Sequence, residues 1–265
     1  MTSNSKSVVW ITGASSGIGE ACACVYARRG DFLILTSSSA ERLEPVAERC
    51  RNFGAEVCVL PYDFQSLDHV DSLVKKAWSI YGRVDVLYCN AGVSQRTDIA
   101  DTSMETVRKI MEINYFAPVA MVKNALPLML ESGGCHVAVT TSIAGYFGFP
   151  LRCAYSSSKF ALIGFFETLN AEYAKKGIKV TMVCPGRVRT NISFNALGIN
   201  GEKHNMMDSG QDGGLSPEKA ASIIVRAIDK GKREVLVGGK ELLMVYIKRF
   251  LPSLCARLSR KIKPM

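Results

Sequence analysis

Short runs of apolar, often β-branched residues alternate with longer stretches of helical periodicity along most of the chain. The runs predict strands at 8–12, 32–36, 56–61, 84–89, 136–141, 179–184 and 234–237. Runs such as Val8-Val9-Trp10-Ile11 are apolar at consecutive positions. This pattern indicates burial on both faces, as in a parallel sheet that is covered by helices.

Amphipathic stretches fill the intervals and predict helices at 17–29, 40–53, 66–81, 103–131, 153–175 and 217–230. Ser66 and Ser103 stand where N-caps are expected, and Ser216 precedes Pro217 at the start of a helix. The regular βαβ alternation predicts an α/β fold with a doubly wound parallel sheet, a Rossmann fold. Right-handed crossovers leave few other topologies.

Two segments depart from this alternation. Residues 191–216 are rich in Gly, Asn, Asp and Ser and follow a strand end, at the edge where open α/β sheets bind ligands. We expect a mobile lid over a substrate there, the alternative being a surface insertion without a role. We expect a single catalytic domain over 1–240 and a helical, amphipathic extension over 241–265 that Pro252 kinks.

Charge is distributed unevenly along the 265 residues, which suffice for one such domain. The net charge is +9, and from Lys240 onward seven Lys and Arg residues stand against Glu241 alone. The rest of the chain is close to neutral, so no nucleic-acid partner is indicated. The basic extension is expected either to dock on the domain or to attach reversibly to an anionic membrane surface.

Cysteines and histidines give no sign of disulfides or metal. The nine cysteines are scattered without a Cys-x-x-Cys pair, and His69, His136 and His204 lack metal-ligand spacing. Residues 1–7 are polar, unlike a signal peptide, and no apolar run approaches the ~20 residues of a membrane span. We expect a cytoplasmic protein with reduced, mostly buried thiols, any membrane contact being peripheral through the extension.

A glycine-rich turn, Thr12-Gly13-Ala14-Ser15-Ser16-Gly17-Ile18-Gly19, separates the first strand from the first helix. Glycine lets the backbone approach a pyrophosphate, and the helix N-terminus offers free N–H groups and a positive dipole end. The spacing is not the common dinucleotide fingerprint, and such a sequence can be only a tight turn. Its position favours a nucleotide site made by Gly13, Ser15, Ser16, Gly17, Ile18 and Gly19.

The second strand ends in Thr36-Ser37-Ser38-Ser39, with no acid before Glu41 and no base before Arg42. Ser37 and Ser38 can donate to a 2′-phosphate, which a carboxylate would repel, so NADP(H) is favoured over NAD(H). Later strand ends carry further candidates for the nucleotide site, each of which alone would be read as a cap or turn: Asp63, Phe64, Asn90, Ala91 and Gly92.

Tyr155 and Lys159 stand four residues apart at the start of a predicted helix, and Ser142 ends the strand before it. Residues four apart share one helical face, so the Lys159 ammonium should lie near the Tyr155 phenol. A phenol has a pKa near ~10, and a nearby cation would lower it toward the range of general acid/base catalysis. Such a pair is common by chance, so the other motifs must support it.

Taken together, these motifs resemble the short-chain dehydrogenase/reductase family over residues 7–190. The resemblance rests on Thr12-Gly13-x-x-x-Gly17-x-Gly19, Asp63, Asn90-Ala91-Gly92, Asn114, Ser142, Tyr155-x-x-x-Lys159, Pro185-Gly186 and Thr190. It implies hydride transfer between a nicotinamide dinucleotide and a ketone or secondary alcohol. It also implies a homodimer or homotetramer that forms through the helices at 103–131 and 153–175.

The resemblance also implies a role for each residue. Tyr155 is the acid/base, Ser142 orients the substrate, Lys159 also binds the nicotinamide ribose, and Asn114 supports Lys159 through a water relay. The nicotinamide would lie against Pro185, Gly186, Val188 and Thr190. Family members that use NADP often carry a basic residue near Ser16 or Ser38, and here both positions are serine.

The candidate substrate walls are largely apolar and include Ser94, Phe147, Phe149 and Phe194 beside Ser142. They suggest a lipophilic carbonyl such as a steroid, retinoid, fatty-acyl or xenobiotic ketone, unless these aromatic residues belong to the core. The alternative function is a catalytically silent dinucleotide-binding or membrane-peripheral regulatory protein. The intact Ser142, Tyr155 and Lys159 argue against it.

Overall fold

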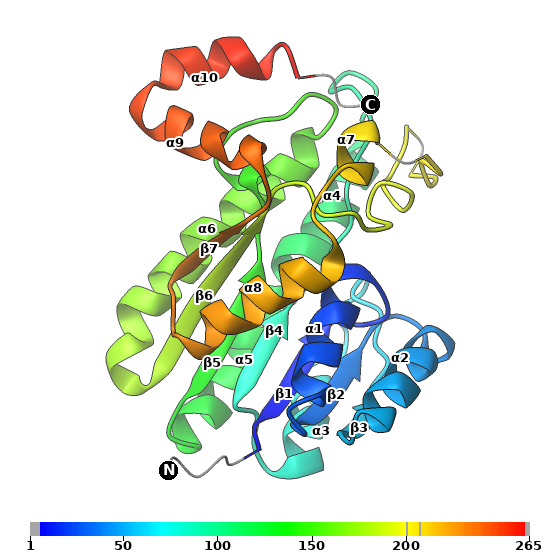
Figure 1. Ribbon diagram of the computed structural model, residues 1–265, viewed down its shortest axis with the longest axis vertical. Coiled ribbons are helices and arrows are strands. Elements are labelled where there is room, and N and C mark those ends of the chain that lie inside the picture. Colours follow the sequence, from blue (N-terminus) through cyan, green and yellow to red (C-terminus); the bar gives the residue numbers. More distant parts are fainter. Residues whose placement is uncertain (1–5, 200, 207, 263–265) are drawn as a thin grey trace.

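A seven-stranded sheet forms the centre of the molecule, and all of its paired strands are parallel (Figure 1). The computed structural model describes residues 6–199, 201–206 and 208–262. The strand order is β3-β2-β1-β4-β5-β6-β7, which confirms the predicted doubly wound arrangement. The strands are β1 (Val8–Thr12), β2 (Phe32–Thr36), β3 (Glu56–Val59), β4 (Val86–Cys89), β5 (Cys135–Thr140), β6 (Ile178–Pro185) and β7 (Glu234–Val237).

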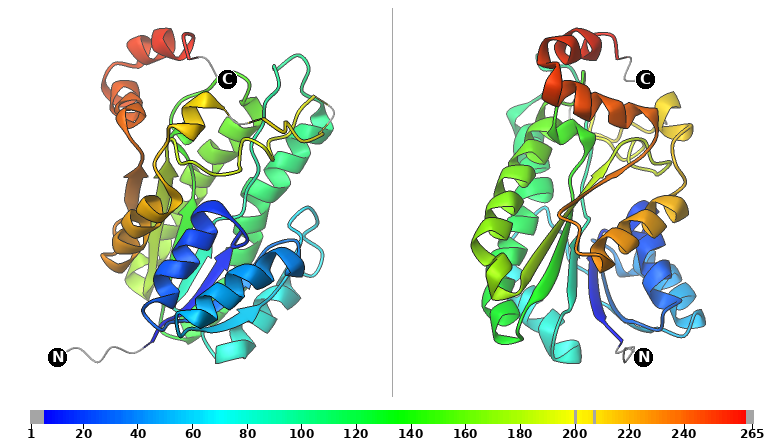
Figure 2. Two further views of the ribbon diagram at one scale, coloured as in Figure 1. Left: turned by 45° about the vertical axis from the view of Figure 1, so that its right-hand side comes forward. Right: turned by 60° about the vertical axis from the view of Figure 1, so that its left-hand side comes forward.

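Helices cover both faces of the sheet, as the right-hand view of Figure 2 shows. Alternate residues of β1 serve different layers: Val9 and Ile11 belong to one buried cluster, whereas Trp10 belongs to the other. The first cluster is completed by α1 (Gly17–Ala27), α2 (Ala40–Asn52) and α8 (Pro217–Asp229), and the second by α3 (Val70–Tyr81), α5 (Ala117–Glu131) and α6 (Cys153–Tyr173).

Two of the three predicted helix starts are confirmed. The hydroxyls of Ser103 and Ser216 accept hydrogen bonds from backbone N–H groups of the first turns of α4 (Met104–Met111) and α8. The expectation for Ser66 is wrong, since α3 begins at Val70 after His69 in a left-handed conformation. Ser66 instead closes a local turn, because its hydroxyl donates to the Asp68 carboxylate at 2.8 Å.

The helix expected over 103–131 is interrupted by one wide turn. The π-helical segment Glu112–Phe116 joins α4 to α5. Pro118 has no N–H to donate to the carbonyl four residues earlier, which is that of Asn114, so the normal α-helical ladder cannot continue there. The wide turn carries Asn114, which is buried behind Gly92 and does not itself line the cavity described below.

The C-terminal extension is helical, as expected. A 3₁₀ turn (Lys240–Leu242) leads into α9 (Leu243–Phe250), and Pro252 starts α10 (Pro252–Ser259), which folds back beside α9 (Figure 2). Val245 and Cys255 pack against Ile143 and Phe147 of the main domain. Among the described residues, no helix is long and apolar enough to cross a membrane. Lys263 of the predicted basic extension lies outside the described residues.

The nine cysteines are all free thiols. Cys58 and Cys153 are half-buried and the others are buried, which agrees with the expectation of reduced, mostly buried cysteines.

Candidate active site

One cavity of about 870 Å³ lies at the carboxyl edge of the sheet and extends from the glycine-rich turn to the segment 191–216. This edge is where open α/β sheets bind ligands. The cavity brings together most of the residues singled out in the sequence. They are Gly13, Ser15, Ser16, Gly17, Ile18, Ser37, Ser38, Asp63, Phe64, Asn90, Ala91, Gly92, Ser94, Ser142, Phe147, Phe149, Tyr155, Lys159, Pro185, Gly186, Val188 and Thr190.

The glycine-rich turn has a geometry that side chains would block. Gly13 and Gly17 have φ values of +63° and +59°, in the left-handed region. A Cβ on Gly13 would lie 2.8 Å from the Cα of Ala91, and one on Gly17 would lie 3.0 Å from the methyl of Thr190. Ser16 precedes α1 without capping it through its side chain, so the first N–H groups of the helix are left for another acceptor. The turn therefore fits the pyrophosphate of a dinucleotide.

Gly19 corrects one expectation, because it does not line the cavity. A Cβ there would lie 2.3 Å from the carbonyl oxygen of Gly13. The residue therefore allows α1 to pack closely on the turn that follows β1. It shapes the site from behind instead of touching a ligand.

At the end of β2, the structure supplies a cation that sequence spacing did not assign. The Arg42 guanidinium donates to the Ser38 hydroxyl at 2.7 Å, and both residues line the cavity with Ser37. Arg42 lies in the first turn of α2, four residues after Ser38, so the start of α2 carries the base back to the strand end. Glu41 accepts from Ser39 and does not line the cavity.

The ends of β3 and β4 are fixed by their own polar contacts. Asp63 accepts from the backbone N–H and the side-chain amide of Gln65, each at 3.0 Å. The Asn90 amide donates to the carbonyl oxygens of Thr12 and Gly13 and accepts from the Thr140 hydroxyl. Asn90 thus ties β4 and β5 to the glycine-rich turn.

Ser142, Tyr155 and Lys159 meet on the opposite side of the cavity. The Lys159 Nζ lies 5.6 Å from the centre of the Tyr155 ring and donates to the carbonyl of Thr140 at 2.8 Å. Ser142 follows β5, and its hydroxyl donates to the carbonyl of Pro185 and forms a hydrogen bond with Tyr155. This geometry places a hydroxyl, a phenol and an amine around one point in the cavity.

The charge argument made for Tyr155 from the sequence needs correction. Burial raises the pKa of the Tyr155 phenol, opposed by the Ser142 hydrogen bond and by the charges of Arg152 and Arg96. Burial also lowers the pKa of Lys159 to about 7. The cations that favour the phenolate here are therefore the two arginines, because Lys159 is itself buried and readily loses its charge.

Asn114 lies next to this group without touching Lys159. Its side-chain amide donates to the carbonyl of Val93 and to the Ser158 hydroxyl, and its oxygen accepts from the N–H of Val93. A Cβ on Gly92 would lie 3.1 Å from that oxygen and 3.6 Å from the Lys159 Nζ. Asn114 thus joins the π-helical turn to the end of β4 and to α6.

Gln95 follows Ser94 of the expected substrate wall, but it does not line the cavity and instead holds the start of α6. Its side-chain oxygen accepts from the N–H groups of Ala154 and Tyr155, at 2.9 and 3.4 Å. The N-cap residue of α6 is Arg152, and its side chain forms no capping hydrogen bond with these N–H groups. Gln95 is fully buried and fixes the helix turn that carries Tyr155. A glutamine shortly after a strand gave no signal of this contact.

The segment 191–216 contributes Asn191, Ile192, Asn195, Leu197 and Asp208 to the cavity, among others. The expectation for Phe194 is wrong, because its side chain is 39% exposed and does not line the cavity. The reason lies in the neighbouring Ser193, which is buried and accepts from Arg96. With Ser193 held inward, the adjacent Phe194 faces solvent.

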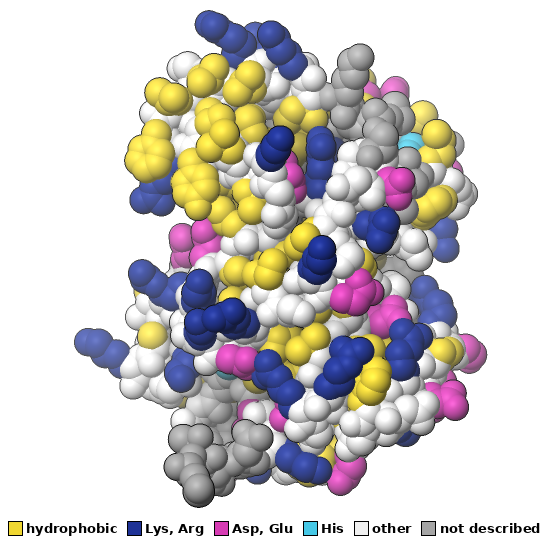
Figure 3. Space-filling model, viewed as in Figure 1, with side chains coloured by type: hydrophobic (Ala, Val, Ile, Leu, Met, Phe, Trp, Pro, Cys, Tyr) yellow, Lys and Arg dark blue, Asp and Glu magenta, His cyan; other side chains and the backbone are white. Residues whose placement is uncertain are grey.

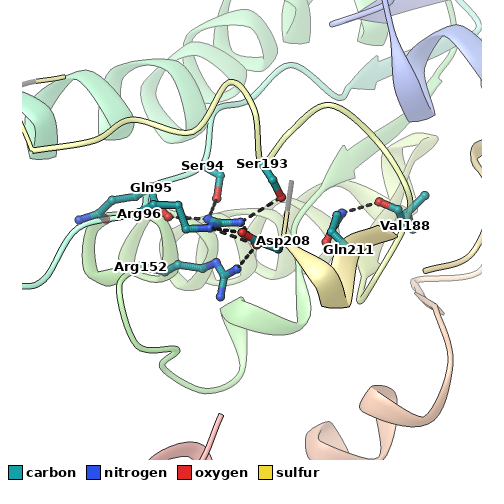
Figure 4. A network of polar contacts seen from close by, with 8 residues as sticks. All are labelled: Ser94, Gln95, Arg96, Arg152, Val188, Ser193, Asp208 and Gln211. Carbon is teal, nitrogen blue, oxygen red and sulfur yellow. Dashed lines mark hydrogen bonds and ion pairs between the residues drawn. The ribbon is translucent and has the colours of Figure 1, made fainter. Parts of the chain in front are cut away.

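A buried network of two arginines and one aspartate joins this segment to the main domain (Figure 4). Arg96 follows β4 and pairs with Asp208 through its Nε and one terminal nitrogen. Arg152, just before α6, donates to the same carboxylate at 2.9 Å. The side chains of Arg96 and Asp208 are 2% and 6% exposed. Gln211 adds a hydrogen bond to the carbonyl of Val188.

This network places two cations, of which Arg96 is buried and Arg152 partly buried, and one anion beside the cavity. Burial and the charge of Arg96 lower the pKa of Arg152 to about 10, so it stays charged at neutral pH. Burial disfavours the Asp208 carboxylate, but the hydrogen bond and charge of Arg96 hold its pKa below the ordinary value. The sequence did not indicate the contact, since Arg96 and Asp208 are separated by 112 residues.

Glu241, at the start of the C-terminal extension, contacts the backbone just after β6. Its carboxylate accepts from the N–H groups of Arg187 and Gly239, at 2.8 and 3.0 Å. A Cβ on Gly186 would lie 2.5 Å from the same carboxylate. The position of Gly186 in the cavity therefore depends on this contact with the start of the C-terminal extension.

Comparison with known proteins gives consistent results. The family model for short chain dehydrogenase matches residues 7–197. The dehydrogenase/reductase SDR family member 7B of Xenopus laevis is 37% identical over 254 residues, covering 93% of this chain and 79% of that protein. A short-chain dehydrogenase from Streptomyces avermitilis is 30% identical, with a TM-score of 0.83 over 98% of this chain and 97% of that one.

A further solved structure is an alcohol dehydrogenase from the archaeon Thermococcus sibiricus in complex with 5-hydroxy-NADP. It is 28% identical, with a TM-score of 0.75 over 89% of this chain and 97% of that one. The matched region includes the glycine-rich turn and the Tyr155-x-x-x-Lys159 motif. The chain therefore belongs to the short-chain dehydrogenase/reductase family of oxidoreductases.

Proposed function

We propose that this protein interconverts a ketone and a secondary alcohol with a nicotinamide dinucleotide, and that Tyr155 is its acid/base. The observation that carries the proposal is the shared cavity. The turn that fits a pyrophosphate and the group of Ser142, Tyr155 and Lys159 line the same space. Residues 1–240 would form the catalytic domain, with 191–216 as its lid.

In the direction of reduction, Ser142 and Tyr155 would hold the carbonyl oxygen between their hydroxyls. The raised pKa of Tyr155 keeps the phenol protonated at neutral pH, so it can donate its proton to that oxygen. Arg152 and Arg96 would stabilise the phenolate left behind, and Lys159 would return a proton to it. Asn114 would hold the backbone of Val93 beside this group and support a water relay to Lys159.

When bound, the dinucleotide would supply or accept the hydride. Its pyrophosphate would be held by the turn at Gly13–Ile18, its adenine by Asp63 and Phe64, and its nicotinamide half by Asn90–Gly92, Lys159 and residues 185–190. NADP(H) is preferred in this proposal. Arg42, Ser37 and Ser38 line the cavity at the end of β2, where they offer a cation and two hydroxyls to a 2′-phosphate.

The substrate would be lipophilic. Phe147 and Phe149 line the cavity with their ring centres 4.6 Å apart, and Ile192, Leu197 and Met244 add further apolar surface. Such a lining favours a steroid, retinoid, fatty-acyl or xenobiotic ketone over a small polar one. Phe147 is also part of the buried cluster under α9, so its core and substrate roles coexist.

The direct test is a turnover assay with NADPH and NADH against ketones of increasing apolar size, and with the alcohols in reverse. We expect reduction that depends on NADPH and becomes more efficient as the apolar part grows. Tight dinucleotide binding without turnover of any carbonyl would support the alternative, a catalytically silent dinucleotide-binding protein.

Self-association and location complete the proposal. Phe116 and Phe160 are each 46% exposed, on the π-helical turn before α5 and on α6, where the family resemblance implies subunit contacts. We propose a cytoplasmic homodimer or homotetramer through these helices. Its mass by sedimentation, compared with that of Phe160→Glu, tests the assembly: a monomeric wild type would refute it.

A further inference from the structure

The outer face of the C-terminal helices is apolar and uncovered. Leu243, Tyr246 and Phe250 lie at positions i, i+3 and i+7 of α9 and are 62, 53 and 71% exposed. Leu251, between the two helices, and Leu254 of α10 continue this face, with 55 and 39% exposure. Figure 3 shows apolar side chains gathered over α9 and α10. We refer to these five side chains as the C-terminal patch.

The helical hairpin formed by α9 and α10 is attached to the main domain by a different surface from the patch. That task falls to Val245 and Cys255, which are buried against Ile143 and Phe147. The two helices thus bury one face and leave a second apolar face exposed. Soluble surfaces rarely gather so many large apolar side chains unless another body covers them.

Every charged residue of the two helices that carry the patch is basic. Lys248, Arg249, Arg257, Arg260 and Lys261 are all exposed, and no acid occurs from 242 to 262. Figure 3 shows Lys and Arg side chains beside the apolar ones. Large apolar groups ringed by cations are typical of helices that lie in the interface of an anionic bilayer.

The patch lies near the cavity. Met244 and Ile262, at either end of the hairpin, line the cavity, and so do Lys240 and Glu241 just before it. A surface on which the patch rests would therefore lie close to the substrate end of the active site.

We propose that the C-terminal patch docks this protein on an anionic lipid surface. Leu243, Tyr246, Phe250, Leu251 and Leu254 would enter the acyl boundary while the five cations contact headgroups. Docking follows from the patch and its charges and does not depend on the proposed reaction. If that reaction is correct, a lipophilic substrate could pass from the bilayer into the adjacent cavity.

A second copy of the chain fits the patch less well than lipid does. In a two-fold contact the same surface meets itself, so the five cations of one copy would face those of the other. Such like charges repel when they are brought together. An anionic headgroup layer removes this repulsion and accepts the apolar side chains at the same time.

Vesicle flotation with the full chain tests the proposal, using neutral phosphatidylcholine vesicles and vesicles that also contain phosphatidylserine. We expect binding to the anionic vesicles that weakens as salt is added. Phe250→Ser with Leu251→Ser should abolish flotation. Ile99→Ser is the matched control, since Ile99 is 75% exposed on a loop and lies outside the patch.

Charge reversal tests the role of the cations beside the patch. Lys248→Glu with Arg249→Glu should weaken anionic-vesicle binding by about 25-fold or more, at about fivefold for each cation lost. Lys230→Glu with Lys232→Glu removes two exposed cations elsewhere and should leave binding unchanged.

Either of two results would overturn the proposal. One is flotation that is absent or equal for the wild type and the Phe250→Ser/Leu251→Ser variant. The other is a dimer by sedimentation that this variant converts to monomer, which would assign the patch to a second copy. Turnover of a water-soluble ketone without vesicles, measured in parallel, reports on the proposed reaction separately.

Discussion

The two ends of the cavity are built in different ways. The cofactor end is made of strand ends and one turn, and its shape depends on where a Cβ cannot fit, as at Gly13 and Gly17. The substrate end depends on side chains that meet from distant parts of the chain, such as Arg96 and Asp208. The comparison teaches that a site formed by local backbone geometry is visible in sequence, whereas one formed by long-range ion pairs is not.

The largest effect is expected from breaking the ion pairs at the substrate end. Asp208→Asn would leave the buried Arg96 and the partly buried Arg152 without an anion, at a cost of about 3–5 kcal/mol in the free energy of unfolding. Chemical denaturation measures this loss. Asp71→Asn, which removes an exposed i,i+4 pair with Lys75, should cause no measurable change. Equal stability of the two variants would show that the Asp208 network does not hold segment 191–216.

Lys159 gives the next effect, through pH. Its pKa is lowered from 10.5 in the unfolded chain to about 7 in the folded one, so the unfolded state binds more protons between these values. The free energy of unfolding of the wild type should therefore rise with pH across this window. Below pH 7, the cost of burying the charged Lys159 ammonium is fully present.

Lys159→Met removes this penalty. In thermal unfolding without dinucleotide, the variant should be more stable than the wild type by an amount on the order of a few kcal/mol at pH 7. The advantage should shrink as the pH rises toward 10. An advantage that is independent of pH would mean that Lys159 keeps its charge in the folded protein.

The cofactor end is broken most directly at Gly19. Gly19→Ala would force the turn away from α1, since its Cβ would meet the Gly13 carbonyl. Because the pyrophosphate would lose more than one hydrogen bond to a charged group, each worth about 1.5–3 kcal/mol, we expect dinucleotide affinity to fall by about 100-fold or more. Calorimetric titration measures it. Gly164→Ala, also in a helix but with no atom near the new Cβ, should bind normally.

The smallest of these effects concerns cofactor choice. Arg42→Ala should weaken NADPH binding by about 10- to 100-fold, the value of a hydrogen bond to a charged group, and leave NADH binding unchanged. Arg51→Ala removes an exposed arginine near the other end of α2 and serves as the control. An equal loss for both dinucleotides would remove the argument for NADP(H).

The sequence was sufficient to predict the sheet, its helices and most cavity residues. Continuous apolar runs require burial on both faces, and a glycine turn between a strand and a helix has few other uses. The errors have local physical causes. Ser66 closes a turn instead of capping a helix, Gly19 packs behind the site, and Phe194 faces out because Ser193 is held in.

The contacts that could not be predicted share one property. Each is a side-chain hydrogen bond whose partners meet only in the folded chain. They are the contacts of Gln95 with the first N–H groups of α6, of Arg42 with Ser38, and of Asp208 with Arg96 and Arg152. The effect expected of Lys159 on Tyr155 failed for a similar reason. Sequence spacing gives the proximity of the two groups, whereas the degree of burial that sets their pKa values comes from the whole fold.

The most direct test of the central claim compares Tyr155→Phe with Tyr26→Phe. Both changes remove one tyrosine hydroxyl, and that of Tyr26 is buried and has no hydrogen-bond partner among the described residues. If Tyr155 supplies the proton, its loss should lower kcat by about 1000-fold while the Kd of the dinucleotide stays unchanged. Tyr26→Phe should keep both values. A Tyr155→Phe variant with most of its kcat would contradict the account.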